Sequence, residues 1–161
     1  MNPRVAPFAD MYKFDAGFLK KQLEGISDAD LHKRINNAGI SMHWIAGHMA
    51  ASRVHVCQII GAKAEFEHSE LFGGNGKDLQ DPSAYPPIAE IMKTFDSSSR
   101  KLTKRLGELK EKDINKKGKD KWPQGGKTVL DAISFMCWHE GWHLGQIAYL
   151  KKRLGYKSLA G

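Results

Sequence analysis

The chain has 161 residues, a net charge of +7, 41% hydrophobic residues and 27% charged residues. This composition is typical of a globular protein and excludes a wholly disordered chain. A chain of this length buries most of its apolar surface without disulfides or metal, so we expect one domain, 1–161, in which a metal would be functional. No apolar run approaches the ~18 residues of a membrane span, and the N-terminus has no signal-peptide core. With only two cysteines, these features predict a cytoplasmic protein that does not bind membranes.

The positive charge is concentrated in residues 110–127, which include seven lysines. Arginines are few there, aromatic residues are not interleaved, and no nucleic-acid-binding motif is present. We therefore interpret this stretch as a solvated loop and expect no nucleic-acid partner. A basic loop can also steer an anionic substrate towards a site.

Four segments have the apolar spacing of amphipathic helices, and none alternates convincingly like a strand. The first covers roughly residues 4–25 and is followed by a turn that Ser27 caps. After a polar link at residues 36–39, the second runs from Ser41 to about Ala62.

A connector of about 20 residues separates the second helix from the third, although bundle connections usually have ~2 to 8. Its length suggests successive helices that need not be antiparallel neighbours, and it contains glycines at 73, 74 and 76. The third helix opens at Pro86-Pro87 and continues to Leu109. The fourth begins at Thr128, which forms an approximate capping box with Asp131, and stops at Gly155. The four segments predict an all-α four-helix bundle.

Two histidines in the fourth segment, His139 and His143, lie one helical turn apart on the same face. Neutral imidazole binds zinc, nickel, copper or iron, and burying two imidazoles on an apolar face is costly unless something satisfies them. At ~100° per residue, His48 shares the inward face of the second helix with Trp44 and Ile45. The predicted metal ligands are therefore His48, His139 and His143.

The remaining histidines and both cysteines fit this set less well. His43 lies about 140° around the helix from His48, and His55 lies two turns further along, lining the bundle but too far to share an ion. His32 and His68 fall in connectors and are expected to be exposed. Cys57 and Cys137 point away from the ligands and are expected to be small core residues. Their spacing does not determine whether they form a disulfide.

The sequence His139-Glu140-Gly141-Trp142-His143 also matches the zincin protease motif, in which the glutamate is the general base. No Asp or Glu follows Glu140 and no His follows His143, so the usual downstream third ligand is missing. Protease activity is therefore disfavoured. Glu140 could support the metal site, act as a base, or be a plain solvent-facing or bundle-edge carboxylate.

The chain resembles the DinB/YfiT-like family, whose members are expected to be metalloenzymes. The resemblance covers essentially the whole chain in helix order and rests on Asn36-Asn37, on Trp44-Ile45-Ala46-Gly47-His48 and on residues 139–147, which begin with His139 and end with Gly145-Gln146-Ile147. It implies an up-down-down-up bundle with a long crossover between the second and third helices. It also implies a three-histidine divalent-metal site at His48, His139 and His143, usually holding nickel or zinc.

The resemblance implies two functions, and the absence of a convincing second catalytic residue leaves a third open. The first is a thiol-dependent transferase that uses a low-molecular-weight thiol and a small-molecule substrate, and the second is a metal-assisted hydrolase. The third is a non-enzymatic, stress-associated metal-binding protein. A homodimer through an exposed helix face is compatible with each. Catalytic residues stay unassigned, although Asp10, Tyr12, Asp15 and Ser52 are candidates for a pocket lining.

Overall fold

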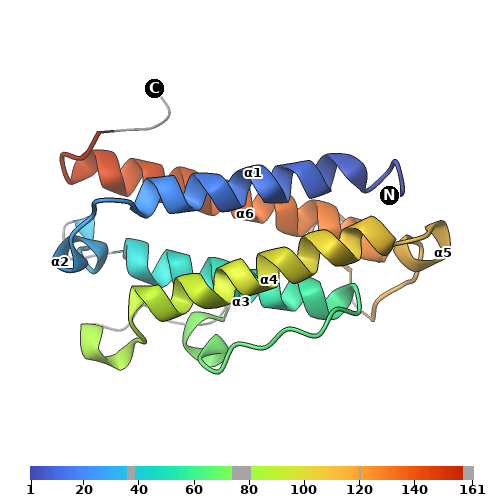
Figure 1. The fold of residues 1–161 in the computed structure, drawn as a ribbon, viewed down its shortest axis with the longest axis horizontal. Helices are drawn as coiled ribbons and strands as arrows, with labels where there is room; N and C mark the ends of the chain where they lie inside the picture. Colours follow the sequence, from blue (N-terminus) through green and yellow to red (C-terminus); the bar gives the residue numbers. More distant parts are fainter. Residues whose placement is uncertain (36–38, 74–80, 120, 158–161) are drawn as a thin grey trace.

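The computed structural model describes residues 1–35, 39–73, 81–119 and 121–157. Its long helices are α1 (Ala6–Leu23), α3 (Met42–Ile59), α4 (Ile88–Glu108) and α6 (Val129–Arg153) (Figure 1). Short helical turns lie in the connections: α2 (Asp28–Leu31), η2 (Ser69–Phe72), η3 (Pro82–Ala84) and α5 (Glu111–Ile114). The only β pairing among the described residues is a bridge between Lys117 and Thr128. The all-α prediction is confirmed.

The direction of the helices explains the long crossover. Figure 1 shows α1 and α6 running one way and α3 and α4 running the other, which is the up-down-down-up arrangement. Helices α3 and α4 are parallel neighbours and pack against each other extensively. An 18-residue helix such as α3 is about 27 Å long, so the chain must return over that length before α4 begins. A short turn could not make this connection.

The helix ends follow the predicted local signals. Ser41 caps α3, because its side chain accepts a hydrogen bond from the backbone N–H of Trp44. Thr128 and Asp131 form the predicted capping box at the start of α6. At the other end, Gly155 adopts a φ of 86°, in the left-handed region that favours glycine. The predicted link at 36–38 and the glycines at 74 and 76 lie outside the described residues.

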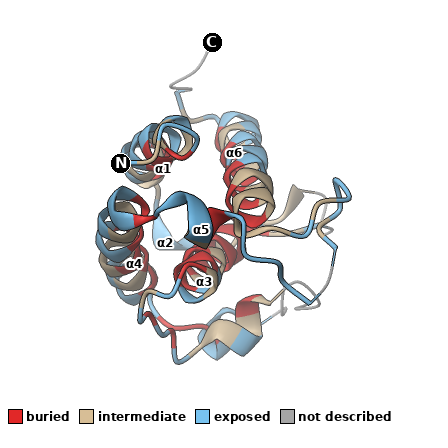
Figure 2. Ribbon diagram, turned by 90° about the vertical axis from the view of Figure 1, so that its right-hand side faces the viewer, coloured by how far each residue is buried: buried red, intermediate tan, exposed pale blue. Residues whose placement is uncertain are grey.

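The core fills the space between the four long helices. Figure 2 shows the buried residues on the faces that these helices turn towards one another. On α4 the buried apolar residues follow the helical repeat and leave the charged face in solvent. They are Ile91, Phe95, Leu102 and Leu106.

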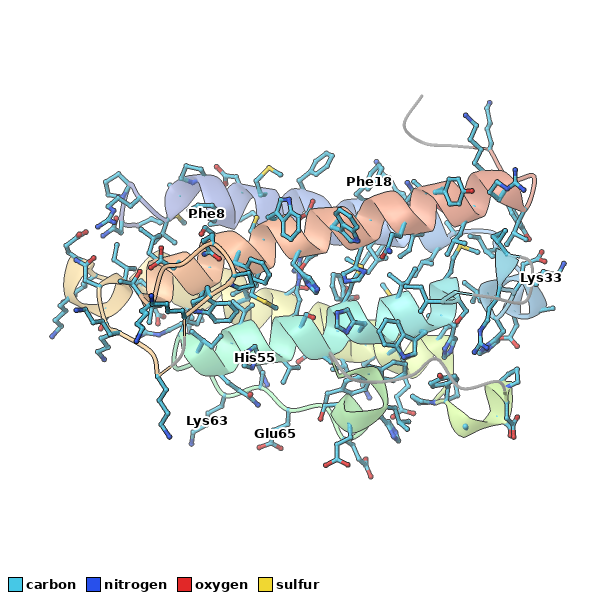
Figure 3. The ribbon with its side chains drawn as sticks, turned by 180° about the vertical axis from the view of Figure 1, so that it is seen from behind. Phe8, Phe18, Lys33, His55, Lys63 and Glu65 are labelled. Atoms are coloured by element: carbon cyan, nitrogen blue, oxygen red, sulfur yellow. The ribbon has the colours of Figure 1, made fainter. Side chains whose placement is uncertain are left out.

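The crossover lies along α3 and closes one side of the bundle. Its η2 turn packs against α3, and Phe72 at the end of that turn is fully buried. Figure 3 shows the molecule from behind relative to Figure 1, with His55 on α3 near Lys63 and Glu65 of the crossover. In the described part of the chain, no helix combines the length and apolar character required to cross a membrane.

Candidate metal site

The structure brings His48, His139 and His143 together between α3 and α6. One ligand atom from each lies within 4.8 Å of the others. The Nε2 atom of His139 is 3.3 Å from Nε2 of His48 and 3.0 Å from Nε2 of His143. Two facing helices thus supply three nitrogens to one point, which is how bundles build metal sites. Metal ligation by these residues stays a prediction.

The partners of the outer ring nitrogens indicate which nitrogens could bind an ion. His48 Nδ1 lies 2.6 Å from the Phe72 carbonyl oxygen, and His143 Nδ1 lies 2.7 Å from Oε1 of Gln146. Both partners are acceptors, so both Nδ1 atoms carry the proton when the rings are neutral. The Nε2 lone pairs are then directed inward. Such a donor set fits a divalent cation, and the outer hydrogen bonds of His48 and His143 are the usual support for a metal-binding histidine.

The surroundings keep the three imidazoles neutral, which is the form that binds metal. Burial lowers the pKa of His48. Burial, together with the nearby His48 ring, lowers the pKa of His139 to about 4, and similar causes lower that of His143 to about 4. The rings therefore carry no charge at neutral pH. Nδ1 of His139 is buried with no hydrogen-bond partner among the described residues.

The η2 turn and Trp44 hold His48 in place. The Trp44 indole stacks on the His48 ring with centroids 5.0 Å apart, and its Nε1 donates to the carbonyl oxygen of Leu71. The next carbonyl, that of Phe72, accepts from His48. Two successive carbonyls of the crossover thus engage two side chains one turn apart on α3. The sequence analysis considered only the length of this connector and did not predict that it would support a ligand.

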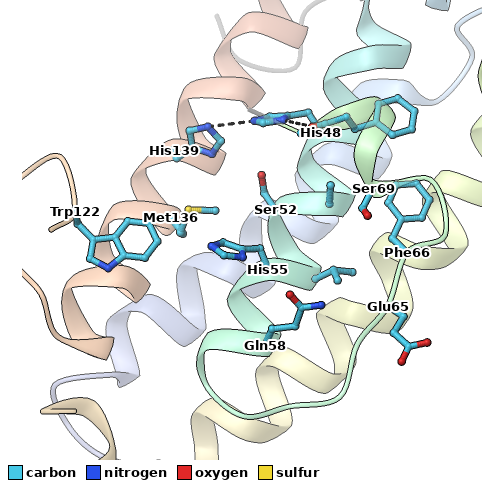
Figure 4. A pocket seen from close by; sticks show the side chains of 14 residues that line it. His48, Ser52, His55, Gln58, Glu65, Phe66, Ser69, Trp122, Met136 and His139 are labelled. Atoms are coloured by element: carbon cyan, nitrogen blue, oxygen red, sulfur yellow. Dashed lines mark hydrogen bonds between the residues drawn. The ribbon is translucent and has the colours of Figure 1, made fainter. Parts of the chain in front are cut away.

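A pocket of about 700 Å³ leads to the histidines from outside the bundle. His48 and His139 form one end of it, whereas Gln58 and Glu65 lie at the other (Figure 4). The walls between these ends are mostly apolar and include Phe66, Phe72, Trp122 and Met136. A bound ion would therefore have one side facing a space large enough for a small molecule.

Glu140 is neither solvent-facing nor directed at the histidines. It is 3% exposed and pairs with Arg53, whose Nε donates to it at 2.8 Å. The same guanidinium donates to Ser99 and to the carbonyl oxygen of Tyr12, and it lies 4.4 Å from the centroid of the Phe95 ring. The expectation of a solvent-facing carboxylate is therefore wrong. The missed signal was Arg53, a cation on the inward stripe of α3 that needs a buried anion.

The histidines outside the predicted ligand set range from buried to exposed. His43 is buried and stacks on His32 at 4.2 Å, so His32 is half-buried rather than exposed. His68 is also half-buried, beside Glu90. His55 is exposed and lines the pocket instead of the bundle interior, although it lies only ~20° round the helix from the buried His48.

Of the four residues considered for the pocket lining, Ser52 alone contributes to it. Tyr12 and Asp15 are buried in the core, and Asp10 is exposed on α1. Cys57 and Cys137 are free and buried, as small core residues would be.

Comparisons with known proteins agree with this geometry. The family model of the DinB superfamily matches residues 19–147. The solved structure of YfiT from Bacillus subtilis, described as a probable metal-dependent hydrolase with an unusual four-helix bundle topology, superposes with a TM-score of 0.70. That likeness covers 98% of this chain and 91% of the other at 14% sequence identity, so it supports the fold alone. No curated protein matches the chain. Because the family model covers most of the sequence, the chain belongs to the DinB superfamily.

Proposed function

We propose that this protein is a divalent-metal-dependent enzyme in which His48, His139 and His143 hold nickel or zinc and a low-molecular-weight thiol is transferred to a small electrophile. The observation that carries the proposal is the convergence of three neutral imidazoles at the end of an accessible pocket. A purely structural site would be closed on all sides, whereas His48 and His139 border this pocket.

A divalent ion with three neutral ligands would retain its full charge and lower the pKa of a thiol or water placed beside it. The protein's own residues orient the ligands and shape the space for the reactants. Phe72 and Gln146 hold the rings of His48 and His143, while Met136 and Phe72 form apolar parts of the pocket wall. In the proposed transfer the thiol proton passes to solvent. A sulfur–carbon bond then forms as the bond from that carbon to its leaving group breaks.

Within the described ranges, the lack of an available carboxylate base beside the histidines favours a thiol over water as the nucleophile. Among the described residues, Glu65 is the only carboxylate that lines the pocket, and it lies at the end away from the histidines. Glu140 is paired with Arg53 and does not line the pocket. A free thiol has a pKa of ~8.5 and water one of ~15.7, so a thiol needs far less help to lose its proton.

Hydrolysis is the second candidate, because the YfiT structure with this fold is described as a probable metal-dependent hydrolase. In this reading a water molecule would take the place of the thiol, and the substrate would carry an ester or amide bond. The histidines and the pocket would have the same roles.

The first test is the metal content of the protein purified without an affinity tag or chelating column. We expect close to one nickel or zinc per chain, lost in His48→Ala and His143→Ala and retained in the matched control His55→Ala. The loaded protein is then assayed for glutathione or cysteine consumption with 1-chloro-2,4-dinitrobenzene and for hydrolysis of p-nitrophenyl acetate. Thiol consumption that disappears in both histidine variants supports transfer, and ester cleavage alone favours hydrolysis. A folded, metal-free wild type that cannot be loaded would refute both.

A further inference from the structure

A second hollow adjoins the metal pocket on the side of the lysine-rich loop, residues 116–127. It has a volume of about 320 Å³ and is lined by Lys119, Lys121 and Lys127. His55 and Trp122 line both this hollow and the metal pocket, so the two spaces meet at this pair of side chains. Figure 4 shows Trp122 and His55 on either side of the space below His139.

Backbone hydrogen bonds join the two ends of the lysine-rich loop, and the Trp122 ring packs it against the bundle. The Gly118 N–H donates to the carbonyl oxygen of Lys127 at 2.7 Å, and the Trp122 N–H donates to that of Gly126 at 2.8 Å. The Trp122 ring packs on Phe135 of α6, with centroids 5.6 Å apart. These contacts position Lys127 and Trp122 beside α6, as expected of a binding surface.

The charged residues of the described lining are all lysines, and the Asp131 carboxylate lies at the edge of the hollow, where it accepts hydrogen bonds from Thr128. The described lining contains three lysines and no aspartate or glutamate. None of the three lysines forms a salt bridge with a described acid. Like charges gathered in one concavity repel each other, and an anion placed among them removes that repulsion.

We propose that the lysine hollow binds an oxyanion, a carboxylate or phosphate, at the far end of the substrate whose reacting group lies at the histidines. This inference rests on the proposed function and specifies its substrate class. His48 and His55 are seven residues apart on α3, about 10 Å by helical rise. Trp122 and Met136 line the space between the histidines and the lysines. The substrate is thus elongated, with an apolar middle and an anionic end at least ~10 Å from the reacting atom.

The test measures anion binding to metal-free protein at pH 8, so that an ion at the histidines cannot contribute. Phenyl phosphate and benzoate are the probes, and benzamide is the neutral control. Binding is followed through the indole N–H signals in NMR spectra, assigned with Trp122→Phe and Trp44→Phe. Trp122 reports on the lysine hollow, and Trp44, which stacks on His48, reports on the histidines.

We expect at least one of the anions to shift the Trp122 signal and benzamide to shift neither signal. The triple variant Lys119→Gln, Lys121→Gln, Lys127→Gln should bind the anion roughly tenfold more weakly. The matched control Lys63→Gln, Lys112→Gln, Lys152→Gln removes the same charge from exposed positions elsewhere and should bind like wild type. The tighter of the two anions identifies the preferred oxyanion.

The inference would be overturned if wild type, the triple variant and the control bound the anion with equal affinity. It would also be overturned by a shift of the Trp44 signal alone, or by no binding of either anion. Metal content is measured separately on the same preparations. A protein that loads metal but shows no lysine-dependent binding refutes the oxyanion site and leaves the proposed function intact. A protein that cannot hold metal but binds the anion through these lysines refutes the metal-dependent function and retains the anion site.

Discussion

The ring of Phe72 lies directly against Gly47, so that a Cβ atom at residue 47 would come within 2.2 Å of the ring. The carbonyl of the same Phe72 accepts the hydrogen bond from His48, the next residue along α3. The close approach of the crossover to α3 and the orientation of a candidate metal ligand therefore depend on one glycine. No side chain larger than hydrogen fits at this position without moving Phe72.

Gly47→Ala should weaken metal binding even though residue 47 is not a ligand. Displacing Phe72 removes the acceptor that orients His48, and loss of such an outer hydrogen bond typically lowers metal affinity ~10- to 100-fold. Overpacking should also cost ~1 to 3 kcal/mol of stability. Both effects can be measured, by competition with a zinc chelator and by denaturant unfolding of the metal-free protein.

Gly141→Ala is the control, since nothing lies within 4 Å of a Cβ atom there and the residue sits between His139 and His143. It should leave metal affinity unchanged. Adding Phe72→Ala to Gly47→Ala relieves the clash and should recover part of the lost affinity. A Gly47→Ala protein with wild-type affinity would show that the Phe72 contact does not support His48.

The pair of Arg53 and Glu140 should govern stability without affecting metal content. Replacing Arg53 by Met leaves the Glu140 carboxylate buried and unpaired, which should cost ~3 to 5 kcal/mol in the free energy of unfolding. The double variant Arg53→Met, Glu140→Leu removes both charges and should regain most of that loss. Denaturant unfolding and metal analysis test this, and loss of metal from the folded double variant would mean that Glu140 supports the site.

Much of the fold was accessible from the sequence because its signals are local. Apolar spacing located the four long helices, and Thr128 with Asp131 marked the start of α6 to within one residue. The histidine cluster was accessible for a similar reason, since His139 and His143 share a face through helical geometry alone. The helix directions came from the family resemblance.

The features that escaped sequence reasoning depend on contacts between distant segments. Nothing local indicates that Phe72 would supply the acceptor for His48, because residues 48 and 72 meet only when the crossover folds back on α3. The partner of Glu140 is Arg53, on another helix, so its burial could not be read from α6. The prediction of a loop over residues 110–127 was wrong for Glu111–Ile114, which form α5, and the position of the remaining loop beside the pocket follows from the packing of Trp122.

Metal affinity should persist to lower pH than at an ordinary histidine site. Protons compete with metal only below the pKa of each imidazole, and burial lowers the pKa of His139 and His143 to about 4. Protonation of His139 and His143 should therefore reduce zinc affinity only below about pH 5, and the lowered pKa of His48 should likewise delay the loss that its protonation causes. Equilibrium dialysis from about pH 8 to below about pH 5 tests the expectation, and a fall that begins near the ordinary histidine pKa of ~6.5 would contradict it.

Asp15 should make the protein less stable as the pH rises. Its side chain is buried, one carboxylate oxygen has no hydrogen-bond partner among the described residues, and Glu140 lies near it. Burial, with a smaller contribution from Glu140, raises the pKa of Asp15 to about 7, while Arg53 partly opposes the shift. In the unfolded chain this carboxyl has a pKa near 3.9. Between these values the folded protein binds the extra proton, so this group's contribution to stability falls as pH rises from about 4 to about 7.

Asp15→Asn removes this titration while keeping the shape of the side chain. The variant should be more stable than wild type at pH 8, by up to ~4 kcal/mol for a shift of about three pKa units, and the difference should vanish below about pH 3, where the wild-type carboxyl is protonated in both states. Urea unfolding of the metal-free proteins at several pH values measures the difference directly. Asp10→Asn, at an exposed position on the same helix, is the control and should show little change with pH. A constant difference between Asp15→Asn and wild type across this range would mean that Asp15 is ionised in the folded protein throughout.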